Sequence, residues 1–246
     1  MSELTGKVAF VTGGSRGIGE AIVRRLAAQG AQVVFTYVNS EDKARAVASD
    51  LEVAGHRVTA LRVDSADAAA LQRAVNDTAK RLGRLDIVVN NAGIGGKGAF
   101  EAVTLEQIDQ MLAVNTRAAF VVAQAAVRHM GEGGRIISLG SNLAERVPFA
   151  GATLYAMSKS ALLGFTRGLA RDLGPRGITV NLVQPGATDT DMNPASGPTA
   201  ELQRGLMAIP RYGDARAVAG LVAWLASPEA QSTTGASLVV DGGTNA

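Results

Sequence analysis

Tyr155 and Lys159 have the clearest chemical potential in the chain, and they stand four positions apart in the run LYAMSKSAL. Residues four apart share one face of a helix, so the phenol and the ammonium project together. A free phenol has a pKa of about 10, and a cation within about 4 to 6 Å favours the phenolate and lowers that pKa. We therefore predict a tyrosine tuned for proton transfer to a developing alkoxide. The same spacing also occurs by chance in many helices, so its surroundings decide its meaning.

Three further polar motifs stand at or beside predicted strand ends. Ser141 follows the apolar run RIISL, Asn115 lies in MLAVNTRA, and NNAG occupies residues 90–93. The carboxyl ends of the strands in an open α/β sheet meet at one edge, where such folds bind ligands. We expect these motifs to converge with Tyr155 and Lys159 on a single crevice.

A glycine-rich turn, TGGSRGIG, follows the first apolar run. Gly13, Gly17 and Gly19 let the backbone turn sharply, and the free N–H groups that open the next helix favour a pyrophosphate. A glycine turn alone is a weak signal, but its place between a strand and a helix is the context that a dinucleotide site requires. The turn therefore predicts a bound dinucleotide.

The end of the second predicted strand distinguishes the two nicotinamide cofactors. An acidic side chain at that point binds the ribose hydroxyl of NAD, and it repels the additional phosphate of NADP. Here the position holds Tyr37, followed by Asn39 and Ser40, which can donate hydrogen bonds to a 2′-phosphate. Arg16 in the glycine turn can supply the counter-charge. NADPH/NADP+ is therefore the expected cofactor.

The elements that position these residues alternate along the chain between short apolar runs and longer helical patterns. Such alternation implies parallel strands with right-handed crossovers, and continuous apolar runs are typical of strands covered on both faces. The predicted fold class is α/β, a doubly wound seven-stranded parallel sheet with helices on both faces. The predicted strands are KVAFVT, QVVFTY, RVTALRV, LDIVVN, RIISL, ITVNLV and SLVV.

The chain shows no linker, repeat or composition break, so one domain over residues 1–246 is predicted. Two long helices are expected, at about 104–129 and 155–173. The stretch at about 186–210 holds Pro194, Gly197 and Pro198 and is too long for a plain connection in a compact domain. We expect it to be a mobile lid over the substrate site.

Composition excludes several classes of protein. The 24 basic and 22 acidic residues give a net charge of +2 and are interspersed, which argues against a nucleic-acid site. The absence of cysteine removes disulfides, thiolate nucleophiles and Cys-ligated zinc. His56 and His129 lie in separate elements, so neither a metal site nor a Ser-His-Asp triad is predicted. With no signal-peptide pattern and no apolar span of the ~18 residues that a membrane helix needs, we expect a cytoplasmic protein.

Taken together, TGGSRGIG, NNAG, the Asn of AVNT, the serine, YAMSK and the downstream PGATDTDM resemble the short-chain dehydrogenase/reductase family over essentially the whole chain. The resemblance implies a Rossmann-type homotetramer that uses NADPH to reduce a small-molecule ketone to a secondary alcohol. By the same resemblance Ser141 would polarise the carbonyl oxygen and Tyr155 would protonate it. Lys159 would bind the nicotinamide ribose and lower the tyrosine pKa, and Asn115 would anchor a water that links Lys159 to solvent.

The resemblance also implies a set of cofactor-binding residues. Thr188 departs from the family pattern, which often has Ile or Val there, but a contact through backbone atoms would survive that difference. Asp64 and Ser65 would line the adenine, residues 91–93 the adenosine side, and residues 185–190 the nicotinamide. The full set is Gly13, Ser15, Arg16, Gly17, Ile18, Gly19, Tyr37, Asn39, Ser40, Asp64, Ser65, Asn91, Ala92, Gly93, Tyr155, Lys159, Pro185, Gly186, Thr188 and Thr190.

Two other functions stay open beside a general carbonyl reductase. One is a 3-oxoacyl-[acyl-carrier-protein] reductase of fatty-acid synthesis, which would need a basic docking patch. The other is a non-catalytic dinucleotide-binding regulator of the cyclic di-GMP type on the same scaffold. The candidates for a docking patch are Arg128, Arg146, Arg204 and Arg211, which scattered surface charge also explains.

Some residues near these motifs have more than one interpretation. Asp189 and Asp191 are predicted to form a turn and cap a helix rather than to act as a glycosidase or metal pair. Glu145 and Arg146 face either substrate or water. Trp224 has helical spacing with neighbouring leucines, which predicts core or subunit packing.

Overall fold

The computed structural model describes residues 3–246, and within them one seven-stranded parallel sheet has the order β3-β2-β1-β4-β5-β6-β7. The order runs outward from β1 in both directions, which confirms the predicted doubly wound, Rossmann-type α/β fold. The strands are β1 (Val8–Val11), β2 (Gln32–Tyr37), β3 (Val58–Arg62), β4 (Ile87–Asn90), β5 (Arg135–Leu139), β6 (Thr179–Pro185) and β7 (Ser237–Val240).

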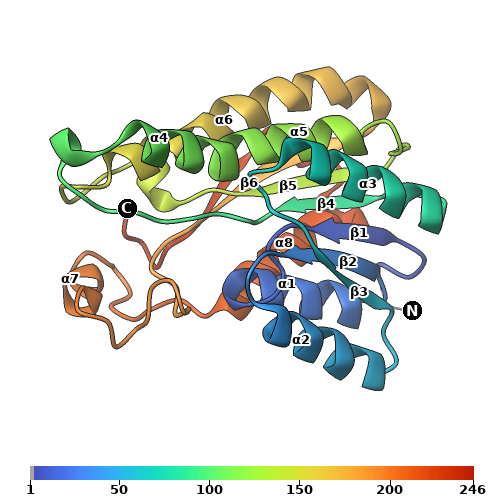
Figure 1. Cartoon of the computed structure of the whole chain (residues 1–246), viewed down its shortest axis with the longest axis horizontal. Helices are drawn as coiled ribbons and strands as arrows, with labels where there is room; N and C mark the ends of the chain where they lie inside the picture. Colours follow the sequence, from blue (N-terminus) through green and yellow to red (C-terminus); the bar gives the residue numbers. More distant parts are fainter. Residues whose placement is uncertain (1–2) are drawn as a thin grey trace.

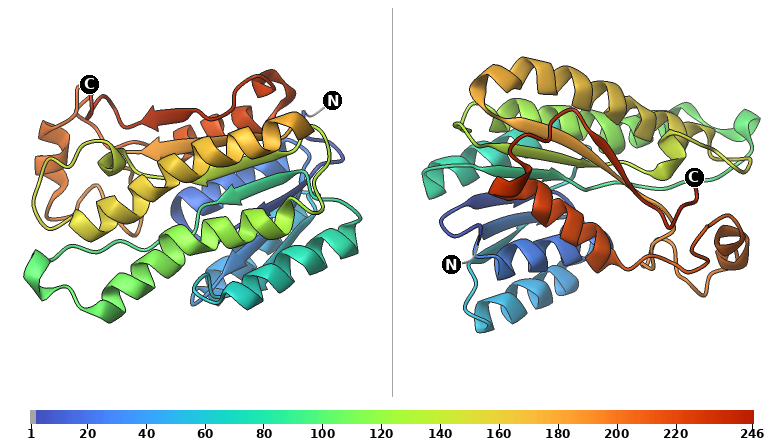
Figure 2. Two further views of the ribbon diagram at one scale, coloured as in Figure 1. Left: turned by 90° about the horizontal axis from the view of Figure 1, so that it is seen from above. Right: turned by 180° about the vertical axis from the view of Figure 1, so that it is seen from behind.

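Helices cover both faces of this sheet (Figure 1). One layer holds α3 (Ala68–Leu82), α5 (Ala118–Ala126) and α6 (Thr153–Leu173), and the other holds α1 (Gly17–Ala28), α2 (Glu41–Val53) and α8 (Ala215–Ala226). The views from above and from behind show the same two layers (Figure 2). Across residues 3–246, no helix has both the length and the apolar character needed to cross a bilayer.

Strand β1 illustrates how the sequence builds the two layers. Its four residues are all buried, and side chains alternate between the faces of a sheet. Val8 and Phe10 pack with α3, α5 and α6, whereas Ala9 and Val11 pack with α1 and α8. A strand covered on both faces therefore has a continuous apolar run rather than an alternating one.

The predicted helix over 104–129 is interrupted. Helix α4 (Leu105–Leu112) begins with a capping box between Thr104 and Gln107, and a π-helical turn (Ala113–Arg117) separates it from α5. A π-helical turn inserts one residue into an α-helix, and helical periodicity in a sequence does not reveal it. The insertion carries Asn115.

The 186–210 segment is more ordered than its sequence indicates. It contains the short helix α7 (Ala200–Gly205) and an isolated bridge between Thr190 and Asn193. The amide groups of Asn193 and Gln203 exchange two hydrogen bonds, at 3.0 and 3.1 Å. Helix α7 lies away from the sheet, on the side where the C-terminus also lies (Figure 1). The expectation of an irregular segment is therefore wrong in part.

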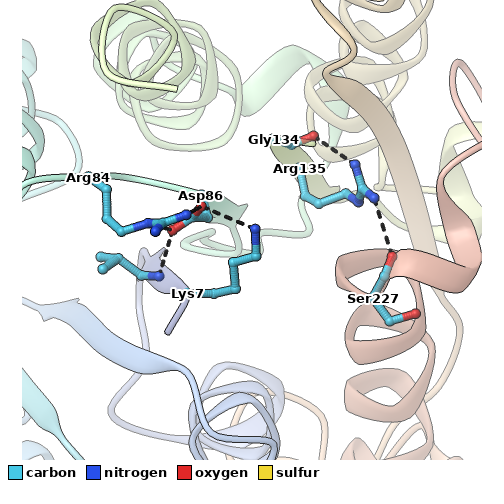
Figure 3. A network of polar contacts seen from close by, with 7 residues as sticks. Lys7, Arg84, Asp86, Gly134, Arg135 and Ser227 are labelled. Atoms are coloured by element: carbon cyan, nitrogen blue, oxygen red, sulfur yellow. Dashed lines mark hydrogen bonds and ion pairs between the residues drawn. The ribbon is translucent and has the colours of Figure 1, made fainter. Parts of the chain in front are cut away.

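At the amino ends of the strands, Asp86 joins the starts of β1 and β4 (Figure 3). Its carboxylate accepts hydrogen bonds from the Val8 N–H at 2.9 Å and from Arg84 at 2.6 and 2.8 Å, and Lys7 Nζ lies 3.5 Å away. Burial alone would raise the pKa of Asp86, but the bonds from Arg84 and Val8, with the charges of Arg84 and Lys7, hold it below its ordinary value. Nearby, the buried Arg135 donates to the carbonyl groups of Gly134 and Ser227.

Replacing Asp86 with Asn should lower the free energy of unfolding at neutral pH by about 1–2 kcal/mol, because a charged acceptor of a buried N–H is lost. Because the folded-state pKa of Asp86 is lowered, its stabilisation is present above the unfolded pKa and disappears as pH falls through the folded pKa. Urea unfolding from neutral to acidic pH should therefore show the two proteins converging in acid. Asp77→Asn, an exposed control, should change stability little. A difference that stays constant across the pH range would contradict this account.

Candidate active site

A cleft of about 1060 Å³ opens at the carboxyl edge of the sheet. The turn after β1, the ends of β2 and β4, the loop after β5, the start of α6 and the 186–210 segment all contribute to its wall. Each predicted site residue except Asn115 lines it. The structure thus brings together residues that are far apart in the sequence.

The glycine turn is held against the end of β4 by Asn91. The Asn91 side-chain amide donates to the carbonyl groups of Thr12 and Gly13, both at 2.9 Å, and the Thr12 hydroxyl accepts from the N–H groups of Asn91 and Ala92 at 3.0 Å. A Cβ at Gly19 would lie 2.1 Å from the Gly13 carbonyl oxygen and 2.4 Å from that amide. Glycine is therefore required at position 19 for this turn to close.

The start of α1 leaves room and donors for an anion. A Cβ at Gly14 would meet Phe35 at 2.6 Å, and Gly13 and Gly17 have φ angles of 69° and 56°, a region that favours glycine. Arg16 is the N-cap residue of α1, and its side chain makes no capping hydrogen bond. The first N–H groups of the helix are thus available to a phosphate group.

The end of β2 carries no carboxylate. Tyr37, Asn39 and Ser40 line the cleft there, and Arg16 faces them from the glycine turn with its side chain half exposed. Hydroxyl, amide and guanidinium groups suit a phosphate monoester better than a pair of ribose hydroxyls. This part of the cleft fits the 2′-phosphate of NADP.

At the other end of the cleft, Lys159 lies next to Tyr155 on α6. Its ammonium group is buried, donates to the Leu139 carbonyl at 2.9 Å and lies 5.9 Å from the centroid of the tyrosine ring. The buried Ser141 hydroxyl accepts from the Leu143 N–H at 3.2 Å and is within hydrogen-bonding reach of the Tyr155 phenol. A hydroxyl donor, a phenol and a cation therefore meet where β5 ends.

Asn115 lies beneath this group rather than in the cleft wall. Its amide oxygen accepts from the Ile94 N–H at 2.8 Å, and its amide nitrogen donates to the Ile94 carbonyl and the Ser158 hydroxyl, both at 3.0 Å. The side chain is thus bonded to protein and fastens the loop after β4 to α6. Its role as a water anchor stays a prediction.

Ser158 is a positioning residue that the sequence analysis missed. It is fully buried, and its hydroxyl donates to the Tyr155 carbonyl at 2.8 Å while it accepts from Asn115. The hydroxyl therefore joins the π-helical turn to the first turn of α6. A serine next to Lys159 in the run YAMSK was visible, but nothing in the run indicated its partner.

The residues with open interpretations mostly bond to the protein itself. Glu145 accepts from Gln184 at 2.6 Å and from Ser237, and Arg146 donates to the Thr244 carbonyl at 2.7 Å. Neither residue lines the cleft and both are exposed, so their bonds to the protein lie at its surface rather than at the substrate site. Further cleft residues that the sequence did not single out are Lys97, Leu143, Phe149, Met192 and Gln203.

Of the two aspartates in the 186–210 segment, one behaves as predicted. Asp189 accepts from the Ala195 N–H at 2.9 Å and so forms the expected turn. Asp191 caps no helix, because its carboxylate pairs with Lys43 of α2 and with Arg16. No three His, Cys, Asp or Glu residues between positions 3 and 246 are grouped so as to hold a metal ion.

Comparisons with known proteins agree with this geometry. A family model described as Enoyl-(Acyl carrier protein) reductase matches residues 13–245. A short chain dehydrogenase from Burkholderia cenocepacia J2315, solved in complex with NADP, is 58% identical, with a TM-score of 0.98 over 99% of this chain and 100% of that one. The chain belongs to the short-chain dehydrogenase/reductase family.

Two further relatives of this short-chain dehydrogenase/reductase have different names. The cyclic-di-GMP-binding biofilm dispersal mediator protein of Escherichia coli (strain K12) is 49% identical over 98% of both chains. A blue fluorescent protein from a metagenomic library, solved in complex with NADPH, is 55% identical, with a TM-score of 0.97 over 99% of this chain and 100% of that one. All these matches extend over almost the whole chain.

Burial moves the pKa values of the two central groups of this short-chain dehydrogenase/reductase in opposite directions. It raises the pKa of Tyr155, and a hydrogen bond with Ser141 offsets only part of that change. It lowers the pKa of Lys159 to about 8. The expectation of a lowered tyrosine pKa is therefore wrong for this structure, because desolvation of the phenol dominates.

Replacing Lys159 with Met should raise the free energy of unfolding near neutral pH by on the order of 1–2 kcal/mol. The reason is that desolvation of the buried ammonium destabilises the fold by more than its hydrogen bond to the Leu139 carbonyl stabilises it. The destabilisation by the buried ammonium is present in full below about pH 8, the folded-state pKa of Lys159. It disappears as pH rises toward 10.5, the pKa of an unfolded lysine. Denaturant titrations at neutral and alkaline pH should show the advantage of the variant shrinking with pH. Lys80→Met, an exposed control, should show no such trend. A variant less stable than wild type at neutral pH would contradict the argument.

Proposed function

We propose that this short-chain dehydrogenase/reductase is an NADPH-dependent oxidoreductase that reduces a ketone to a secondary alcohol. The observation that carries the proposal is the meeting of Ser141, Tyr155 and Lys159 at one end of a cleft whose other end is the glycine turn. A dinucleotide with its phosphates on that turn would extend its reactive ring toward the phenol.

The cofactor part of the proposal rests on the fit of the cleft. The start of α1 would hold the pyrophosphate, and Arg16, Asn39 and Ser40 would hold the 2′-phosphate. Two similar proteins were solved with NADP or NADPH, which supports the same choice. The bound cofactor would supply the hydride, and the protein would supply position and charge. The remaining predicted contact residues, from Asp64 to Thr190, also line the cleft.

The proposed chemistry of the protein follows from the protonation states of its groups. With a raised pKa the phenol of Tyr155 keeps its proton near neutral pH, as a general acid must. The Ser141 hydroxyl would donate a hydrogen bond to the carbonyl oxygen and would polarise the carbonyl group. As Tyr155 gives up its proton, Lys159 in its ammonium form would stabilise the phenolate that remains. Ser141 and Lys159 are buried and Tyr155 is partly buried, which limits the access of competing water.

A carrier-protein substrate has less support. Two of the four arginines considered for a docking patch make internal contacts, because Arg146 bonds to the Thr244 carbonyl and Arg204 bonds to Glu201 and the Ala195 carbonyl. Arg204 also stacks over the ring of Tyr212 at 5.2 Å. Reduction of a 3-oxoacyl carrier protein therefore stays an alternative without a docking surface that favours it.

The alternative of a cyclic di-GMP-type regulator is supported by the name of the Escherichia coli relative. A pure binding protein has no chemical need for a buried lysine beside a phenol, since the buried charge lowers stability. The two functions differ in one respect that can be measured. A regulator would bind cyclic di-GMP in competition with NADPH and would oxidise no NADPH.

Replacing Tyr155 with Phe should reduce kcat/KM for NADPH oxidation by a panel of ketones by about 100-fold or more, because the proton donor is lost. NADPH binding, followed by fluorescence titration, should change little. Tyr212→Phe is a matched control, since this tyrosine lies outside the cleft and its hydroxyl reaches only Asn193 at 3.4 Å. Equal rates in wild type and Tyr155→Phe, or no turnover with any ketone or acetoacetyl thioester, would reject the proposal.

The proposal includes one domain with the 186–210 segment as a substrate lid, in a cytoplasmic homotetramer. Two surfaces support assembly: Phe120 of α5 packs beside Phe165 of α6 and is 56% exposed, and Trp224 of α8 and Val239 of β7 are also partly exposed. Exposed apolar side chains on neighbouring elements are typical of subunit contacts. Light scattering at micromolar concentration should give the mass of four chains. A monomer mass would overturn the assembly.

A further inference from the structure

An ion-pair cluster spans the mouth of the cleft. One oxygen of Asp191, in the 186–210 segment, lies 2.5 Å from Lys43 Nζ of α2 and 3.8 Å from Arg16 Nη1 of the glycine turn. Asp191 and Lys43 are 148 positions apart in the sequence. The carboxylate therefore bridges two cations that belong to the glycine turn and to α2.

The cluster stands at the end of the cleft where β2 finishes. Arg16, Asn39, Ser40 and Asp191 all line the cleft. Ser40 is the N-cap residue of α2, and its hydroxyl makes no capping bond, so it remains available to a ligand. Lys43 follows one turn later on the same helix. The cluster therefore overlaps the place where a 2′-phosphate would sit.

A carboxylate between two cations occupies the same kind of site that a phosphate monoester would. Arg and Lys both bind phosphate oxygens through charge-assisted hydrogen bonds, and a phosphate dianion carries more charge than a carboxylate. Here one carboxylate faces two positive groups. The hydrogen bond and charge of Lys43, with the charge of Arg16, lower the pKa of Asp191, so it is ionised and competes at neutral pH.

The bridge is weak enough to be replaced. The side chains of Arg16, Lys43 and Asp191 are all half exposed, and solvent-exposed ion pairs contribute little to stability. The adjoining Thr190 lies against the glycine turn, with its methyl group 3.3 Å from the position of a Cβ on Gly17. Loss of the bridge would therefore free one anchor of the 186–210 segment and leave the contact at Gly17.

We propose that Lys43 and Arg16 form the cation pair for the 2′-phosphate of the cofactor, and that Asp191 occupies this pair until the phosphate displaces it. The inference rests on the proposed NADPH function and adds Lys43 and Asp191 as specificity-determining residues. It couples the cofactor phosphate to the 186–210 segment, because both need the same two cations. Lys43 then favours the phosphorylated cofactor, whereas Asp191 opposes it.

The two residues therefore have opposite expected effects on binding. Lys43→Gln should weaken adenosine 2′,5′-bisphosphate by about 5- to 10-fold, and Asp191→Asn should strengthen it by about 3- to 5-fold. Neither change should alter the affinity for adenosine 5′-monophosphate, which lacks the 2′-phosphate. Both residues are exposed, so both variants should unfold at the temperature of the wild type.

Isothermal titration calorimetry of the full chain with the two nucleotides measures these affinities without turnover. Arg45→Gln removes a charge from the same helix, and Asp189→Asn removes one from the same segment, so both serve as matched controls. In wild type, hydrogen exchange at residues 189–195 should accelerate with the bisphosphate and stay unchanged with the monophosphate. That acceleration would report release of Asp191 from its cations.

The outcomes separate this inference from the proposed function. If wild type binds the two nucleotides equally, the NADPH assignment fails and the inference fails with it. If wild type prefers the bisphosphate but Lys43→Gln or Asp191→Asn leaves that preference unchanged, the inference alone is overturned. Weaker bisphosphate binding by Asp191→Asn would also overturn it, since Asp191 would then retain the nucleotide instead of competing with it.

Discussion

The attachment of the glycine turn to the end of β4 is the constraint on which the site depends. The Asn91 side chain donates to two consecutive carbonyl groups of the turn. In addition, the Thr12 hydroxyl accepts hydrogen bonds from the N–H groups of Asn91 and Ala92. These bonds join the ends of two neighbouring parallel strands. They also orient the first turn of α1, so the free N–H groups face the cleft. A Cβ at Gly19 would occupy the place of the Asn91 amide, which explains the requirement for glycine better than chain flexibility does.

The chemical end of the cleft depends on burial. Lys159 is buried and donates to the Leu139 carbonyl, Tyr155 is partly buried, and desolvation moves the pKa values of the two groups in opposite directions. This environment disfavours the charged form of each group at rest. When the phenol loses its proton, the phenolate would provide a negative counter-charge for the Lys159 ammonium. A site of this kind lowers stability in exchange for function, as is common for ionisable groups in enzyme interiors.

Much of the fold could be predicted because the physical signal is local. The bounds of β2, β5 and β7 agree with the runs read from the sequence, since a strand covered on both faces needs a continuous apolar run. The π-helical turn could not be predicted in this way. It carries Asn115, whose side chain bonds to Ile94 and Ser158, and these residues lie outside the helix and far from it in the sequence.

The sequence by itself determined the order of the elements, the glycine turn and the identity of the candidate catalytic side chains, because these depend on residue type and short spacing. Only the tertiary structure decided what each side chain contacts. It placed Ser158 between Asn115 and Tyr155, reversed the expected change in the tyrosine pKa, and brought Asp191 to Lys43 across 148 positions. Desolvation and ion pairing depend on neighbours in space, and a linear chain does not specify those until its strands are aligned.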